Sequence, residues 1–593
     1  MMKGLGLAAA GVMIVALNAS PALAAPAPAR GTVFAFGDSL LDLTTICPLQ
    51  YPNNPNKACG SGKGLLQVLP AYAPYSVDLA NDRARGGAGT GSFNIASFLY
   101  GNLATGTLVQ VNAFTAGGGR IGARDLTLVS GRNNFYRFLI QPTLDPAAVA
   151  ASALGEVGQE VGGLVNAGAR DIIYFNSRSP TAGNSTQVNT YEANFSAGLP
   201  AALAAYAAPG TRLRLLNLTG ISAAVLADPA RFGFASGASC VATLATCATA
   251  SAAVQNSYFL YDQHPTEAGY TLIARYIAAL DASADGIAAQ AKVVGAASDA
   301  MSAALLDRAS IDGLTHSHGL FIEGGYAHDH RGTDSGDAGV AAGYRDRIGR
   351  IMGGYSLPLG PATIGAAFGY AHSNARLDEG AGTIRARTYQ GGVYADWRQG
   401  PAFLDATVGY AHHDLDVARA GVANAIGAAP NASSLVAEAR GGWLGGLGAL
   451  KAGPVARVGY DRTHVDGYTE SGDDLLNQIV AGTTAKSLLG RAGVRLESPL
   501  GGTLPIAGFI EANVAHEFED GRRTLTTADT YAPALPIYTV IDRNWAKRTF
   551  GTVDAAVSTG LARRLQVSLR GSSTVFRKDA NSYALEASLN LAL

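Results

Sequence analysis

The chain has few charged side chains for its length of 593 residues. Charged residues make up 15% of it, below the ~25% of an average protein, and the formal net charge is −1. Nucleic-acid-binding proteins carry an excess of basic residues, so this balance gives no reason to expect such a partner. The length exceeds what one hydrophobic core fills, so two or more domains are expected.

Cysteine is also scarce, with four residues in two local pairs, Cys47/Cys59 and Cys240/Cys247. Four cysteines allow three connectivities, and nearness in sequence favours disulfides within each pair. The spacing does not fit a zinc ribbon and no histidine cluster accompanies it, so no metal site is expected. Export would permit such disulfides, because they form and persist in oxidising compartments.

The beginning of the chain has an apolar run, residues 5–17, that is too short for a membrane-spanning helix. Lys3 precedes it, and Ala22-Leu23-Ala24 has the small-x-small pattern of a cleavage site, so residues 1–24 are predicted to be a secretory signal peptide. A single-pass anchor is the alternative, and the polar residues and proline at 18–21 argue against it.

Glycine, in contrast, is abundant: average usage of about 7% would give ~42 residues, and the chain has 74. Within residues 25–282, short apolar runs alternate with alanine-rich amphipathic stretches. This order predicts parallel strands with helices on both faces, an α/β domain. The expected strands are 32–36, 126–130, 170–176 and 212–217, and the expected helices are 146–167, 191–207 and 266–280.

The first apolar run ends abruptly in Gly37, Asp38 and Ser39. A serine at the carboxyl end of a strand is either a helix N-cap or a nucleophile, because reactive sites of open α/β sheets lie at that edge. Far downstream, Asp262 lies two positions before His264. A nucleophilic serine needs such a base and a carboxylate that orients it.

The GDSL run at 37–40 resembles the first block of the GDSL (SGNH) hydrolases, which implies an SGNH-hydrolase-like three-layer α/β/α fold. The resemblance makes Ser39 the nucleophile and gives its backbone N–H a place in the oxyanion hole. Asp262 and His264 resemble the last block of the family. That block is D-x-x-H, whereas Tyr261 here has the usual place of the acid, so either Asp262 or a backbone carbonyl is expected to orient the imidazole.

Two further blocks supply the remaining oxyanion donors that the resemblance implies. Residues 84–88 (ARGGA) resemble the glycine block, with Gly87 as the backbone donor, and residues 131–134 (GRNN) resemble G-x-N-D, with Asn133 as the side-chain donor. Residues 117–119 are an alternative glycine block. Asn134 replaces the aspartate of the family.

Residues 284–310 contain no proline and much alanine, and they predict one long helix of small residues within a linker at 283–315. After it the periodicity changes from 3.6 to 2. At the end of the chain, apolar residues at Tyr583, Leu585 and Leu589 alternate with small or polar ones. About twelve such segments follow residue 318, typical of a transmembrane β-barrel. A soluble sandwich or a lipocalin-like barrel is the alternative.

Recurring glycine–tyrosine pairs in this region suggest tyrosines at strand ends that form aromatic girdles. They stand at 325–326, 354–355, 369–370, 409–410 and 459–460.

The order of an N-terminal domain, an alanine-rich helix and a terminal barrel resembles the type V autotransporters. With a GDSL domain at the N-terminus, the chain resembles the outer-membrane autotransporter esterases. The resemblance implies a passenger at 25–282, a helix in the barrel lumen and a 12-stranded barrel at 316–593. It implies a monomeric surface esterase of Gram-negative cells that needs no cofactor. Its partners would be an ester or lipid substrate, outer-membrane lipid and the barrel-assembly machinery. The alternatives are a weakly active or inactive GDSL domain used for display or adhesion, and a plugged porin.

Overall fold

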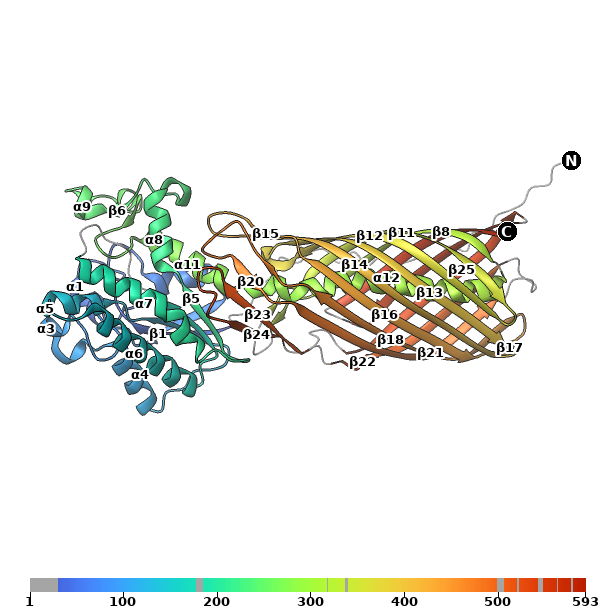
Figure 1. Cartoon of the computed structure of the whole chain (residues 1–593), viewed down its shortest axis with the longest axis horizontal. Coiled ribbons are helices and arrows are strands. Elements are labelled where there is room, and N and C mark those ends of the chain that lie inside the picture. The colour runs from blue at the N-terminus through green and yellow to red at the C-terminus, as the bar shows by residue number, and fades with distance from the viewer. Residues whose placement is uncertain are drawn as a thin grey trace.

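The computed structural model describes residues 30–176, 185–316, 318–335, 340–498, 506–519, 522–541, 548–562, 564–577 and 580–592. The predicted signal peptide, residues 1–24, lies outside these ranges. An α/β domain forms one end of the molecule and a long β-barrel the other (Figure 1).

A five-stranded parallel sheet lies at the centre of the α/β domain, in the order β2-β1-β3-β4-β5. Four of the strands lie where the apolar runs predict them. The edge strand β2 escapes prediction because half of its eight residues are exposed, so it has no continuous apolar run. The strands are β1 (Gly31–Gly37), β2 (Tyr75–Asp82), β3 (Leu126–Ser130), β4 (Asp171–Phe175) and β5 (Arg212–Leu216).

Helices cover both faces of this sheet, because successive side chains of its buried strands enter two separate hydrophobic clusters. One cluster includes α4 (Thr107–Ala116), α6 (Pro146–Asn166) and α7 (Thr186–Ala204). The other includes α2 (Leu65–Val68), α8 (Leu218–Ala227) and α11 (Glu267–Asp281). The predicted three-layer α/β/α fold is confirmed, although α7 begins at Thr186, five residues earlier than expected, directly after its N-cap Ser185.

Shorter elements connect these layers. They are α1 (Ile46–Gln50), α3 (Ser97–Tyr100), α5 (Arg137–Ile140), α9 (Cys240–Thr243), α10 (Ala252–Gln255), β6 (Ser236–Ser239), β7 (Tyr258–Leu260) and the 3-10 turns η1 (Leu69–Ala71), η2 (Gly101–Leu103), η3 (Asn133–Tyr136), η4 (Ala230–Phe232) and η5 (Cys247–Thr249).

Twelve antiparallel strands within the described ranges form the barrel, as predicted, and β27 pairs with β8 to close it. They are β8 (Gly319–Arg331), β11 (Tyr344–Leu359), β12 (Ala362–Leu377), β13 (Thr383–Gln399), β14 (Ala402–Arg419), β16 (Asn431–Trp443), β18 (Leu450–Val465), β21 (Thr483–Ser498), β22 (Ala507–Glu517), β25 (Thr549–Ala562), β26 (Leu565–Val575) and β27 (Ala580–Ala592).

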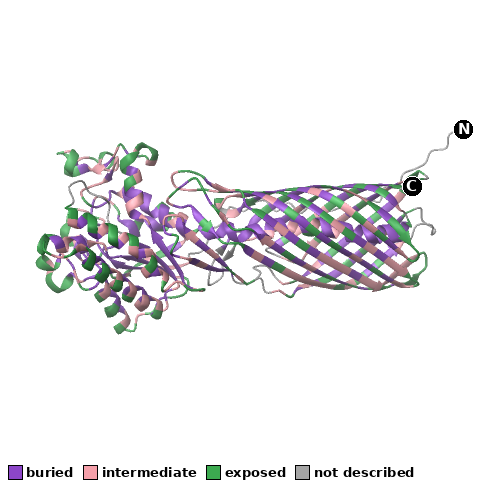
Figure 2. Ribbon diagram, viewed as in Figure 1, coloured by how far each residue is buried: buried purple, intermediate pink, exposed green. Residues whose placement is uncertain are grey.

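The barrel is apolar outside and polar inside. On β27, Leu585 and Leu589 are exposed, whereas the alternate residues Glu586 and Asn590 are buried in the lumen. Figure 2 shows the same alternation of exposed and buried residues along the other strands. This is the pattern that lipid outside and a polar interior impose on a transmembrane barrel.

The tyrosines of the glycine–tyrosine pairs do not lie at strand ends, so that expectation is wrong. Tyr326, Tyr370 and Tyr410 lie near the middle of β8, β12 and β14. The reason is strand length: β14 has 18 residues, whereas about 10 tilted residues cross a membrane. The strands therefore extend past the membrane surface toward the α/β domain. An aromatic girdle at that surface then lies along the strands and not at their ends.

A single helix, α12 (Ser283–Thr315), runs through the lumen (Figure 1). Its small side chains allow this, and polar contacts fix it to the wall. Arg440 on β16 donates to Asp307 Oδ1 at 2.8 Å and to Ser310 Oγ at 2.9 Å. No helix in the described ranges has the length and apolarity of a membrane-spanning helix.

A buried charge cluster joins α12 to the α/β domain. Asp281, the last residue of α11, accepts from Arg30, Arg212 and Arg214 at 3.1, 2.7 and 2.9 Å. Arg30 also donates to Asp285 in the first turn of α12, at 3.3 Å. Burial opposes ionisation of Asp281, but the three guanidinium groups outweigh it and hold its pKa well below the usual range. The domain and the lumenal helix are thus fixed to each other.

Loops at the near end of the barrel also contact the α/β domain. Ile426 and Leu476 belong to the hydrophobic cluster of α8 and α11, and Ala532 and Leu535 to that of α6 and α7; all four are at most 1% exposed. Tyr531 donates to the carbonyl of Leu215. The loops carry β9 (Asp334–Ser335), β10 (Val340–Ala341), η6 (Asp378–Gly380), β15 (Ile426–Ala428), β19 (Tyr468–Thr469), β20 (Gln478–Val480), β23 (Arg523–Asp529) and β24 (Ile537–Ile541), and a far turn carries β17 (Gly445–Leu447).

We expect Leu589→Arg to destabilise the barrel by about 2–4 kcal/mol, because it places a cation on the lipid face. The readout is the temperature at which the folded band is lost in semi-native electrophoresis. The control is Asn581→Arg, an exposed position at the other end of the same strand. Equal melting of the two variants would contradict a lipid-facing position for Leu589.

Candidate active site

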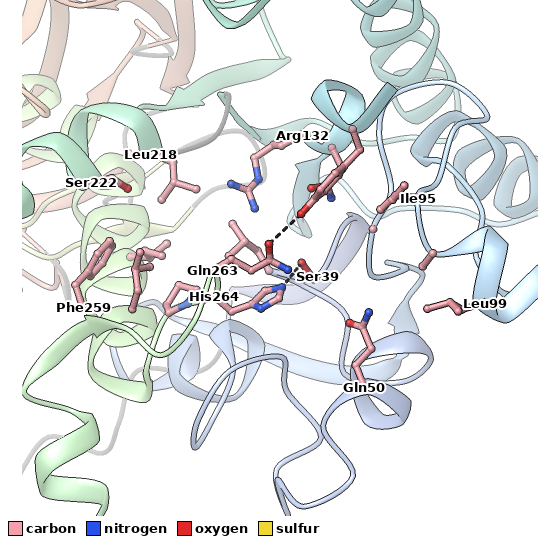
Figure 3. A pocket seen from close by; sticks show the side chains of 18 residues that line it. Ser39, Gln50, Ile95, Leu99, Arg132, Leu218, Ser222, Phe259, Gln263 and His264 are labelled. Atoms are coloured by element: carbon pink, nitrogen blue, oxygen red, sulfur yellow. Dashed lines mark hydrogen bonds between the residues drawn. The ribbon is translucent and has the colours of Figure 1, made fainter. Parts of the chain in front are cut away.

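Ser39 lies at the carboxyl end of β1, between the edge strand β2 and the central strand β3, where the backbone turns sharply. Gly37 has φ +130°, and a Cβ there would lie 1.7 Å from the carbonyl oxygen of Ser130, so only glycine fits. Gln110 fixes the turn: its Oε1 accepts from Gly37 N at 2.7 Å and its Nε2 donates to Gly37 O at 2.9 Å. Ser39 is 8% exposed and its hydroxyl faces the pocket in Figure 3.

His264 meets Ser39 from the loop between β7 and α11. Its Nε2 lies 2.9 Å from Ser39 Oγ, and its Nδ1 lies 3.0 Å from Asp262 Oδ1 (Figure 3 shows the first contact). The same carboxylate oxygen accepts the backbone N–H of His264 at 2.8 Å. Because only one residue separates Asp262 from His264, one carboxylate oxygen contacts both the backbone and the ring of His264.

The charge state of Asp262 fits this arrangement. Burial opposes its ionisation, but hydrogen bonds from His264 and Tyr51 outweigh burial and lower the pKa of Asp262 below its usual value. An ionised carboxylate only accepts, so it holds the proton of His264 on Nδ1. Nε2 is then left as an acceptor for the proton of Ser39.

Gly87 and Asn133 line the same pocket as Ser39 and His264. Within the described part of the chain, the N–H groups of Ser39 and Gly87 donate to no protein acceptor. Asn133 Nδ2 donates one proton to the Ala88 carbonyl at 3.0 Å, which leaves the other for the pocket. Three donors are thus available beside Ser39.

The alternative glycine block lies elsewhere. Residues 117–119 follow α4, do not line the pocket, and a Cβ on Gly118 would meet nothing within 4 Å. Asn134 is fully buried and donates to Thr90 Oγ1 at 2.6 Å, so it supports the loop.

Asp42 is a structural residue of the site that the sequence analysis missed. Its Oδ2 accepts the backbone N–H groups of Ile46, Cys47 and Gly86 at 2.8, 3.1 and 2.8 Å. Asp42 thereby joins the segment after Ser39 to the loop that presents Gly87. The only signal for it is an acid that follows an apolar pair in the GDSLLD run.

A second buried acid, Asp38, holds the other side of the site. It is fully buried, and Arg132 Nε donates to its Oδ2 at 3.0 Å. Arg132 also lines the pocket.

The cavity beside Ser39 has a volume of about 240 Å³. Tyr136 donates to Gln263 Oε1 at 2.9 Å, and both residues line this cavity. In the described ranges no group of three or more His, Cys, Asp or Glu residues could hold a metal ion. The apolar part of the lining consists of Leu40, Ile95, Ala96, Leu99, Leu218, Phe259, Leu260, Pro265 and Ile273.

Residues 299–572 match the family described as autotransporter beta-domain. This segment, somewhat less than half of the chain, is therefore similar to autotransporter β-domains. This part of the chain is thus a translocator barrel, which places the protein in the outer membrane with the α/β domain, its passenger, displayed on the extracellular side.

Solved structures similar to the chain include three autotransporter units. The translocator domain of NalP from Neisseria meningitidis is 17% identical, with 50% of this chain and 97% of that chain covered and a TM-score of 0.39. The β-domain of BrkA from Bordetella is 14% identical, with 47% and 100% covered and a TM-score of 0.32. The transport unit of AIDA-I from Escherichia coli is 14% identical, with 51% and 99% covered and a TM-score of 0.35. A comparison with curated proteins gives no significant match.

The cysteines of the autotransporter passenger lie as two local disulfides, Cys47–Cys59 and Cys240–Cys247. The first joins α1, which contains Cys47, to the segment that follows it. Extracellular display keeps such bonds oxidised.

We expect Gly87→Ala to slow labelling of Ser39 by a fluorophosphonate at least about tenfold, because the reagent develops charge on an oxygen that oxyanion donors stabilise. A Cβ at Gly87 would lie 2.7 Å from Asn94 Oδ1 and displace the loop. Gly118→Ala is the matched control, since Gly118 also has positive φ, +76°, but borders open space. Equal labelling rates for the two variants would remove Gly87 from the site.

Proposed function

We propose that the passenger is a serine esterase that hydrolyses carboxylic esters at the cell surface through an acyl-enzyme. The observation that carries the proposal is the chain of contacts from Ser39 Oγ through His264 to Asp262, at 2.9 and 3.0 Å. Nucleophile, base and orienting acid are the three groups that such catalysis needs. The resemblance of four sequence blocks to GDSL hydrolases agrees with it.

The reaction follows from these positions. Ser39 Oγ attacks the ester carbonyl carbon while His264 Nε2 takes the hydroxyl proton. The carbonyl oxygen gains a negative charge, which the N–H groups of Ser39 and Gly87 and the amide of Asn133 stabilise. The carbonyl re-forms, and the alkoxide leaves with the proton from His264. Water then repeats the sequence on the acyl-enzyme, releases the acid and restores Ser39.

The cavity favours substrates with a short or medium acyl chain. Its volume of about 240 Å³ and its apolar lining fit an alkyl group, while Arg132, Gln50 and Gln263 supply polar groups at the rim. We assign display of this enzyme at the surface to its own barrel, and insertion of that barrel to the barrel-assembly machinery.

The test is hydrolysis of p-nitrophenyl butyrate by cells that display the full chain. We expect Ser39→Ala and His264→Ala to lower kcat/KM by about 10³-fold or more, as loss of a nucleophile or base does. Ser76→Ala, an exposed serine on β2, is the control. Equal rates for wild type and Ser39→Ala would reject the esterase and leave display or adhesion as the role of the passenger.

A further inference from the structure

We propose that Tyr51 is a positioning residue of the active site, which holds Asp262 and His264 in their working geometry from outside their loop. The proposal rests on the proposed esterase function. It assigns a fourth member to the Ser39–His264–Asp262 group and explains how the shortened Asp-x-His spacing is accommodated.

Tyr51 reaches the site from a segment distant in sequence. Tyr51 directly follows α1 and lies between Cys47 and Cys59, which are twelve positions apart and joined by a disulfide. Its backbone N–H donates to Cys47 O at 2.9 Å. Tyr270 on α11 donates to Cys59 O at 3.0 Å, which binds this segment to the helix that follows His264. The backbone around Tyr51 is therefore fixed relative to the catalytic loop.

The phenol of Tyr51 contacts both members of the pair. Its hydroxyl donates to Asp262 Oδ2 and lies 2.9 Å from His264 Nδ1. Its ring stands edge-on to the imidazole, with centroids 5.6 Å apart and an interplanar angle of 86°. The proton on Nδ1 is thus shared between Asp262 Oδ1 and the Tyr51 oxygen, and both orient the ring.

The short spacing between Asp262 and His264 explains why a third group is needed to hold the Asp262 carboxylate. Asp262 Oδ1 is occupied by the backbone and the ring of His264, so Oδ2 points away from them. The side chain of Asp262 is 28% exposed, so without a donor Oδ2 would be free to turn toward water. Within the described ranges, only Tyr51 and His264 donate hydrogen bonds to this carboxylate.

The charges around the pair keep Tyr51 a donor. Burial, and next the charge of Asp262, raise the pKa of Tyr51, so its hydroxyl stays protonated. Other titratable groups also affect the pKa of Tyr51 or of its neighbour Tyr270. They are Tyr261 on the loop of Asp262, Asp38 and Asp42 near Ser39, and Arg132. Of these groups, only Arg132 is a cation.

The test is Tyr51→Phe in the full, displayed chain, which removes the hydroxyl and keeps the ring. We expect kcat on p-nitrophenyl butyrate to fall about 5- to 50-fold, since a hydrogen bond to a charged group is lost, with KM within about twofold. Loss of that donor raises the pKa of Asp262, so the acid limb of the kcat profile should move to higher pH. Tyr72→Phe, at an exposed tyrosine of the same domain, is the control.

A double-mutant cycle with Asp262→Asn separates positioning from folding. If Tyr51 acts through Asp262, the double variant should lose no more than about twofold beyond Asp262→Asn alone. Additive losses, an unmoved pH profile or an unchanged kcat in Tyr51→Phe would each overturn the proposal. Absence of Ser39-dependent hydrolysis in the wild type would instead reject the esterase itself, so the two failures are distinguishable.

Discussion

Pairing of β27 with β8 closes the barrel, and the position of every other part depends on this closure. In lipid each backbone N–H and C=O needs a partner within the protein, and a closed barrel supplies all of them without an edge. Closure also encloses a polar lumen, which α12 fills by contacts such as Arg440 with Asp307. Because α12 enters at one mouth, the α/β domain must lie there.

The α/β domain is fixed at this mouth of the barrel by ion pairs and by apolar contacts. Asp281 and its three arginines fix the start of α12, while Leu476 and Leu535 from the barrel loops complete the hydrophobic clusters on the two faces of the sheet. The end of the domain that carries α3 and α5 lies far from the barrel (Figure 1).

Inside the domain, buried acids set the geometry of the candidate site. Asp42 gathers backbone N–H groups from the segment after Ser39 and from the glycine loop, and Asp38 holds Arg132. These carboxylates are buried where backbone donors or a cation compensate their charge, as burial requires. The donors near Ser39 are therefore fixed before any substrate arrives, which is the condition for electrostatic catalysis.

Periodicity and composition determined the two halves of the chain, about twelve barrel strands and the long helix between the halves. The resemblance to autotransporters placed that helix in the lumen, and the GDSL and Asp-x-His runs indicated Ser39 and His264 as candidate residues. These features are local, since each depends on repeating apolar positions or on a short run such as GDSL. Tertiary structure decided the rest: the exposed edge strand β2, the tyrosines within the strands, the roles of Asp42 and Tyr51, and the reach of Asp262 to His264. The reason is physical, because a hydrogen bond between residues 211 positions apart, as from Tyr51 to Asp262, leaves no pattern in the sequence around either of them.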